Sequence, residues 1–358
     1  MDNYKVDIDY CMSSFLMYRR VVDQTKSFLE GKRPKTVPLK WDKVPIKDSF
    51  ELEDYLRERV AEATKDGNVA LALSGGIDSA ILAKFMPKGS TAYTFRCIAD
   101  GVKTTDETKI ASQYASICGL KHKIIDIYWK DMVEFAPLLM EKKSAPLHSI
   151  EVQIYKAGMA AIKDGFTGMI YGETADVNYG GLSKILSHDW NTEDFIERYA
   201  YLKPWSVLRH PKMQFIDMTP YVKDDIVDVH KYLSEFDIIE SVNSYVNACE
   251  TAGIKFIAPY AGTYLSQPLD YERVRKGENK YLIREVFSRL YPNLTIPTKI
   301  PMPRPTDEWL KNWNGPKRDE FIEGCQKHLT GDQKWLLWCL ERFLNKIDEI
   351  SGGVDYAK

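Results

Sequence analysis

The stretch Ser74-Gly75-Gly76-Ile77-Asp78-Ser79 lies between a strand pattern and a helical pattern. The five residues before it, 69–73, are all apolar, which is typical of a strand that is buried on both faces of a parallel sheet. After it, apolar residues recur at helical spacing until Pro87 and Gly89. The sequence therefore predicts a strand, a tight turn and a helix over residues 69–86.

This turn has the composition of an anion site. Its two glycines let the backbone approach a ligand closely, Ser74 and Ser79 add hydroxyl groups, and the new helix adds its positive dipole end. Asp78 would repel a bound phosphate unless a cation lay between them, and Mg²⁺ would supply that cation. The turn is not a Walker loop, because no Lys-Ser/Thr follows the glycines at the required spacing.

Strand and helix patterns alternate after this turn. We expect strands over 91–97, 123–128 and 167–171, with helices over 107–117 and 150–162. Helices of this length between strands imply right-handed crossovers and an α/β fold with a doubly wound, mainly parallel sheet. Ligands of such sheets bind at the carboxyl ends of the strands.

The chain is expected to divide into two parts. Residues 1–64, with a helix over 49–63, form an N-terminal lead-in that packs on the main domain. The main domain covers residues 65–350 and ends in a helical C-terminal part from about residue 310.

A second glycine-rich turn, Gly172-Glu173-Thr174-Ala175-Asp176-Val177-Asn178-Tyr179-Gly180-Gly181, leaves the strand at 167–171. Its two carboxylates are three residues apart, so a helix beginning here would place both on one side, where they could act on one ligand. Another acidic pair, Asp106 and Glu107, is explained by the preference of carboxylates for a helix N-terminus, and we leave it outside the expected site.

These stretches resemble known motifs. Residues 74–79 resemble the pyrophosphate loop of the N-type ATP pyrophosphatases, and residues 172–181 resemble the asparagine synthetase motif Gly-Glu-Gly-Ser-Asp-Glu followed by Phe-Gly-Gly. Residues 299–310 resemble that family's Lys-x-Gly-Phe-x-x-Pro-x-x-x-Trp-Leu segment. The chain thus resembles the synthetase domain of the asparagine synthetase family, without its glutaminase domain, and this resemblance implies an adenine nucleotide alpha hydrolase-like fold.

The resemblance also implies a chemistry, with ATP and Mg²⁺ as cofactors. A carboxylate attacks the α-phosphate of ATP to give an acyl-adenylate and pyrophosphate, and a nitrogen nucleophile then displaces AMP to form an amide. Glu173 would orient or deprotonate the amine, and Lys299 would stabilise charge at the α-phosphate. The helix over 280–287 would be scaffold close to the site. The nucleotide would be bound by Ser74, Gly75, Gly76, Asp78, Ser79 and Gly172, and the metal by Asp78 and Asp176.

The substrates stay open. The asparagine synthetase family has the segment Gly-Leu-Glu-Ala-Arg-Val-Pro-Phe-Leu-Asp, and this chain replaces its glutamate, arginine and aspartate with Lys255, Ile257 and Gly262. The resemblance therefore does not imply that aspartate is the small-molecule carboxylate acceptor. Asp2 also stands where family members expose a glutaminase cysteine. We therefore expect free ammonia, ammonia from a separate glutaminase subunit, or another amine as the nitrogen donor.

The totals limit the partners and the compartment. Lys+Arg number 49 and Asp+Glu 51, a net charge of -2, so no overall positive field attracts nucleic acid. The six cysteines are scattered like ordinary thiols of a reducing compartment. The polar N-terminus is unlike a signal peptide, and no apolar run reaches the roughly 18 residues of a membrane span. We expect a cytoplasmic protein without a membrane partner, and leave a homo-oligomer open.

Two alternatives remain. A NAD synthetase-like amidation would share the first motif, although the turn at 172–181 and the segment 299–310 argue against it. A non-catalytic, nucleotide-binding regulatory protein would bind ATP without releasing pyrophosphate. The presence of Asp78, Glu173, Asp176 and Lys299 argues against that second alternative.

Overall fold

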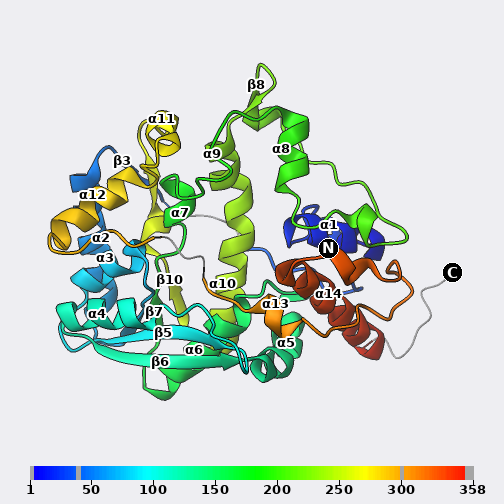
Figure 1. The fold of residues 1–358 in the computed structure, drawn as a ribbon, viewed down its shortest axis with the longest axis horizontal. Coiled ribbons are helices and arrows are strands. Elements are labelled where there is room, and N and C mark those ends of the chain that lie inside the picture. The colour runs from blue at the N-terminus through cyan, green and yellow to red at the C-terminus, as the bar shows by residue number, and fades with distance from the viewer. Residues whose placement is uncertain (1–3, 38–41, 299–301, 351–358) are drawn as a thin grey trace.

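A five-stranded, fully parallel sheet lies at the centre of the computed structural model, which describes residues 4–37, 42–298 and 302–350 (Figure 1). The strand order is β10-β7-β4-β5-β6. The bounds are β4 (Val69–Ala72), β5 (Thr91–Ile98), β6 (Lys121–Tyr128), β7 (Gly168–Ile170) and β10 (Lys255–Ile257). The expected α/β fold with a doubly wound parallel sheet is confirmed.

The inner strands β4 and β7 contain no polar side chains because helices cover both faces of the sheet. In β4, Ala70 belongs to one hydrophobic core and its neighbour Leu71 to the other, and Met169 and Ile170 of β7 divide in the same way. The helices of the first core are α5 (Trp129–Lys143), α6 (Glu151–Lys163) and α10 (Ile238–Ala252), and those of the second are α3 (Ile77–Phe85) and α4 (Thr108–Cys118).

The order of the strands creates a switch point between β4 and β7. The chain continues from β4 to β5 and β6 on one side, whereas β7 and β10 lie on the other side of β4. Connections that leave neighbouring strands in opposite directions open a crevice at the carboxyl ends of those strands. The turns at 73–76 and 171–174 both lie at this crevice.

The N-terminal segment packs on both cores. Phe15 and Leu16 of α1 (Ile8–Tyr18) share the first core with α14 (Gly331–Ile350). Leu52 and Leu56 of α2 (Ser49–Thr64) share the second core with α12 (Tyr281–Leu290). The helix expected over 49–63 is therefore α2, while a domain boundary at residue 64 stays a prediction.

Shorter elements complete the described chain. Paired strands are β1 (Lys5–Val6) with β2 (Lys26–Ser27), β3 (Val44–Ile46) with β11 (Thr263–Leu265), and β8 (Val222–Lys223) with β9 (Ile226–Val227). Short helices are α7 (Ala175–Asn178), α8 (Thr192–Tyr199), α9 (Val229–Tyr232), α11 (Tyr271–Arg275) and α13 (Thr306–Trp309), with a π-helix at Leu233–Asp237 and 3-10 turns at Pro204–Ser206, Thr219–Tyr221, Pro259–Gly262 and Cys325–His328. Within the described ranges, no helix is both long and apolar enough to cross a membrane.

Several helices differ from the sequence expectations. The helices α5 and α10 were not expected, and the helical C-terminal part begins at Gly331 rather than near residue 310. Helix α10 was missed because it buries polar side chains, including Glu240, Asn243 and Asn247, which interrupt its apolar pattern. Their burial is compensated by hydrogen bonds such as that from Asn247 Nδ2 to Glu151 Oε2, 2.8 Å.

Candidate active site

The turn after β4 is held open by its two serines. Ser79 Oγ accepts a hydrogen bond from the Ser74 amide at 3.0 Å, and Ser74 Oγ accepts one from the Gly76 amide at 3.1 Å. Helix α3 begins directly after this turn, and no side chain caps its N-terminus at Gly76. Uncapped amides and the helix dipole make this turn a favourable place for an anionic group.

Gly172 brings the second turn against the first. A Cβ atom at Gly172 would lie 3.1 Å from Cβ of Asp78 and 3.2 Å from the amide nitrogen of Ser79. Contacts this short leave little space for any side chain, so glycine is the residue that allows the turns after β4 and β7 to touch.

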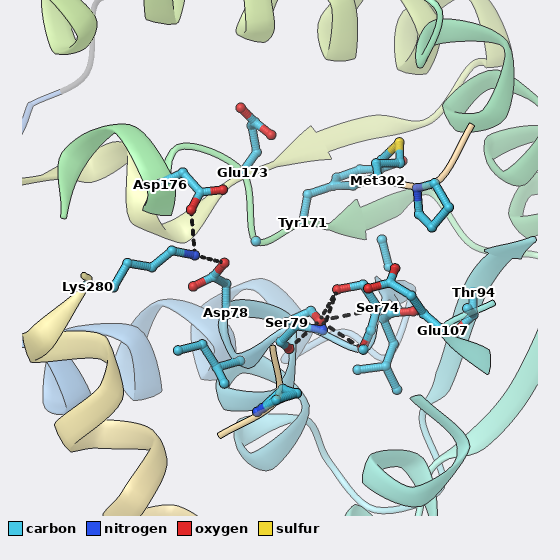
Figure 2. Close-up of a pocket in the computed structure, with 18 of the residues that line it drawn as sticks. Ser74, Asp78, Ser79, Thr94, Glu107, Tyr171, Glu173, Asp176, Lys280 and Met302 are labelled. Carbon is cyan, nitrogen blue, oxygen red and sulfur yellow. Dashed lines mark hydrogen bonds and ion pairs between the residues drawn. The ribbon is translucent and has the colours of Figure 1, made fainter. Parts of the chain in front are cut away.

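One lysine joins the carboxylates of the two turns. Lys280 Nζ lies 2.5 Å from Asp78 Oδ2 and 2.7 Å from Asp176 Oδ1, as Figure 2 shows. Burial alone would lower the pKa of Lys280, but the charges of both aspartates and the hydrogen bonds to them hold it above its ordinary value. The lysine therefore stays protonated between the two aspartates.

The turn after β7 differs from the expected geometry. It forms only the single helical turn α7, which begins at Ala175, so Glu173 precedes the helix and Asp176 lies inside it. Figure 2 shows the Glu173 side chain leaving the turn on the side away from the contacts of Asp176 with Lys280. The two carboxylates therefore have different partners within the protein, Ser241 for Glu173 and Lys280 for Asp176.

Glu173 is held by α10. Ser241 Oγ donates a hydrogen bond of 2.5 Å to Glu173 Oε1, and Tyr245, one helical turn further on, also hydrogen-bonds to this carboxyl group. Burial raises the pKa of Glu173 above its ordinary value, although the bond from Ser241 opposes the shift. A carboxyl group with a raised pKa is better suited to accept a proton near neutral pH.

A cavity of about 610 Å³ lies over these two turns. This volume is in the usual range for a small-molecule site. It is lined by every predicted site residue that the structure describes: Ser74, Gly75, Gly76, Asp78, Ser79, Gly172, Glu173 and Asp176. Lys299 lies outside the described residues, so its predicted role stays a prediction.

Sequence reasoning missed three charged residues of the cavity: Glu107, Lys280 and Arg284. Lys280 was assigned to the scaffold, whereas its ammonium group contacts Asp78 and Asp176 directly. Arg284 lies one helical turn further along α12, and its guanidinium group bonds to the backbone and side-chain oxygens of Asn279. Their spacing of four residues places both on one side of α12, but the sequence does not indicate that this side borders the cavity.

Glu107 is the third missed residue. A Cβ atom at Gly75 would lie 3.3 Å from Glu107 Oε1, so this carboxyl group borders the turn after β4. Burial raises the pKa of Glu107 to about 7, and the neighbouring charge of Asp106 adds to the shift. A helix-start preference explained its place in the sequence but gave no indication of this contact.

The residues present fit a magnesium ion. Asp78 and Asp176 each direct one carboxylate oxygen at the same point, which shows that they can share one cation. Among the residues described, no group of three or more histidines, cysteines and carboxylates gathers in a metal-binding arrangement. Two carboxylates suffice for Mg²⁺ in a nucleotide site, because phosphates and water complete its octahedral shell.

Comparison with known proteins agrees with this geometry. The family model described as asparagine synthase matches residues 51–240, more than half of the chain, and this range includes both turns. No curated protein matches the chain.

Two solved structures are similar to part of the chain. The NMN synthetase from Francisella tularensis is 14% identical, covers 71% of this chain and 100% of its own, and has a TM-score of 0.29. The NH3-dependent NAD synthetase from Campylobacter jejuni is 15% identical, covers 72% and 100%, and has a TM-score of 0.26. Because both TM-scores are low, these two similarities do not assign the chain to a family.

The assignment therefore depends on the family match and on the site. The matched range contains the turn after β4, the turn after β7 and most of the sheet between them. Such a match supports an ATP-dependent amide-forming ligase in general, without naming its substrates. The chain belongs to the asparagine synthase family.

Proposed function

We propose that this protein is an AMP-forming amide ligase, which adenylates a small-molecule carboxylate and transfers ammonia or another amine to it. The observation that carries the proposal is the convergence of Asp78 and Asp176 on one cation beside an uncapped helix N-terminus. That arrangement suits a leaving pyrophosphate group with its counter-ion.

In the first step, a carboxylate oxygen of the acceptor forms a bond to the α-phosphorus of ATP, and the bond to the β-phosphate oxygen breaks. The amides and hydroxyls of residues 74–79 bind the departing pyrophosphate, with Arg284 available from α12. Asp78 and Asp176 would hold Mg²⁺, which neutralises phosphate charge when bound. Lys299 would stabilise charge at the α-phosphate, a role supported by its motif alone.

In the second step, the nitrogen nucleophile attacks the acyl carbon and AMP leaves with the bonding electrons. The nitrogen must then lose a proton, and Glu173 is the carboxylate of this cavity that Ser241 and Tyr245 position away from Lys280. Its raised pKa supports the assignment as general base.

The acceptor differs from aspartate in this proposal. Lys255, at the position of the family's glutamate, begins β10 opposite Gly168, at the end of the strand remote from the cavity. It borders another hollow together with Thr167 and Gly168. Because three charged positions of this segment are replaced, we propose an acceptor whose recognition does not depend on them.

The test is pyrophosphate release from ATP and Mg²⁺ across a panel of carboxylates, with and without ammonium. The panel includes aspartate, uronic acids, small amino acids and deamido-NAD. We expect release to depend on one carboxylate, and the amide product to require the nitrogen donor. Release with deamido-NAD alone would indicate a NAD synthetase-like amidation. ATP binding without release from any acceptor or donor, including ammonia from an added glutaminase, would contradict the proposal.

The variant Asp78→Asn provides a direct check. We expect it to lower the rate of pyrophosphate release at least about 100-fold. The loss of one anionic ligand weakens the binding of Mg²⁺, and less phosphate charge is then neutralised. The matched control is Asp66→Asn, an exposed aspartate just before β4, at the opposite end of the sheet. A near wild-type rate in Asp78→Asn would contradict the role of this aspartate.

A further inference from the structure

The contact of Lys280 with two aspartates is enclosed by the protein. The Lys280 side chain is only 6% exposed. A Cβ atom at Gly181 would lie 2.5 Å from Lys280 Cε and 2.0 Å from Asp176 Oδ1. The lysine itself has a left-handed backbone conformation, φ 55°, at the N-terminus of α12. The ammonium group is thus enclosed by the protein between the carboxylates of Asp78 and Asp176.

We propose that Lys280 is an internal counter-ion that holds the cation position between Asp78 and Asp176 until nucleotide binds. The inference builds on the proposed function and adds an order of binding. In the ligand-free protein, the ammonium group excludes a divalent metal ion. When nucleotide phosphates arrive, Lys280 turns to their oxygens, and the two carboxylates become free to hold the metal ion that accompanies the nucleotide.

Electrostatics supports this exchange. Two carboxylates that share a partly buried point are costly unless a cation neutralises them, and the lysine meets this need in the absence of a ligand. A divalent ion and an ammonium group at the same point would repel each other strongly, so the site holds one or the other. Metal binding without nucleotide must therefore displace Lys280 from both aspartates with no phosphate to receive it.

The nucleotide offers that anion. Lys280 has a flexible four-carbon stem, so its ammonium group can move while its backbone stays fixed at the start of α12. Arg284, on the next turn of α12, also lines the cavity, and its guanidinium group donates hydrogen bonds to the neutral Asn279. Phosphate oxygens in the cavity would thus meet two cations from one helix face.

The experiment measures the binding of Mn²⁺, a spectroscopic substitute for Mg²⁺, by electron paramagnetic resonance and calorimetry. Mn²⁺ is added to the wild type, to Lys280→Met, and to the control Lys276→Met, in which the lysine is exposed and paired with Glu272. Without nucleotide, we expect Lys280→Met to bind one Mn²⁺ at least about tenfold more tightly than the wild type and Lys276→Met. The double variant Lys280→Met/Asp176→Asn should lose this gain.

A second measurement uses the wild-type protein and does not require Lys280→Met to fold. We expect Mn²⁺ alone to leave the melting temperature of the wild type unchanged, and Mn²⁺ with a non-hydrolysable ATP analogue to raise it. Stoichiometric Mn²⁺ binding by the wild type without nucleotide, lost in Asp78→Asn, would overturn the proposal. So would a folded Lys280→Met protein that binds Mn²⁺ no more tightly than the wild type. Neither result depends on turnover, so these binding measurements test the role of Lys280 independently of the proposed ligase activity.

Discussion

At the residue scale, Glu107 borders the turn that would bind phosphate. Its carboxyl group lies beside Gly75, and burial raises its pKa to about 7 from an ordinary 4.5. The folded protein therefore binds this proton more strongly than the unfolded chain does. By linkage, the stability contributed by Glu107 falls as the pH rises from about 4.5 to about 7, and is constant above that range.

The same proton should affect nucleotide binding. A neutral Glu107 tolerates a nearby phosphate, whereas an ionised one repels it, so ATP affinity should fall as the pH rises through 7. We expect Glu107→Gln to bind ATP as the wild type does at pH 6, and about tenfold more tightly at pH 8, one pH unit above the folded pKa. Calorimetric titration at both pH values measures this, with the exposed and distant Asp66→Asn as control. An identical pH dependence in wild type and Glu107→Gln would refute it.

Residue types in the two turns were sufficient to predict residues that line the candidate site. Glycines at 75, 76 and 172 with Asp78 and Asp176 indicate a phosphate and cation site by composition. Lys280 could not be assigned in this way, because it is 202 positions from Asp78 in sequence and no local pattern links them. Only the packing of α12 beside the turns brings its ammonium group to the carboxylates.

At the scale of elements, α7 is held in place by one buried amide. Asn178 Nδ2 donates hydrogen bonds to the backbone oxygens of Tyr260, 2.9 Å, and Thr263, 3.1 Å. Tyr260 in turn donates its hydroxyl to the backbone oxygen of Asp78, 3.1 Å. The turn after β7 and the turn after β4 therefore share a support in segment 259–263.

Removing this amide should destabilise the protein. In Asn178→Ala, the buried carbonyl group of Thr263 loses a hydrogen bond, whereas that of Tyr260 loses one but keeps those from Thr263. We expect the free energy of unfolding to fall by about 1 to 3 kcal/mol. Urea denaturation measures the change, with the exposed Asn312→Ala as control, for which we expect at most about 0.5 kcal/mol. A loss below about 1 kcal/mol in Asn178→Ala would show that α7 is held by other contacts.

Elements with a regular apolar pattern were predicted closely. The strand at 69–73 and the helix at 49–63 appear as β4 and α2, because burial on one or both faces leaves a clear pattern. Helix α5 was missed because it follows β6 without a connecting turn and contains Pro137. Strand β10 was missed because Lys255 interrupts its short apolar run.

At the scale of the whole molecule, the sheet order explains why the two turns meet. Strands β4 and β7 are neighbours in the sheet although almost 100 residues separate them, and the chain diverges on either side of this pair. The sequence predicted the parallel sheet from alternating strands and helices. It could not predict the neighbours of each strand, since that order depends on packing between distant segments.

An adenylating ligase requires that the acceptor carboxylate attacks the α-phosphate of ATP. The most direct measurement uses the acceptor identified by the panel, labelled with ¹⁸O in its carboxylate, and mass spectrometry of the products. Adenylation predicts one ¹⁸O atom in AMP and none in pyrophosphate, because the acceptor oxygen leaves with AMP when the amide forms. Label in inorganic phosphate with ADP as the other product, or AMP without label, would rule out adenylation of the acceptor.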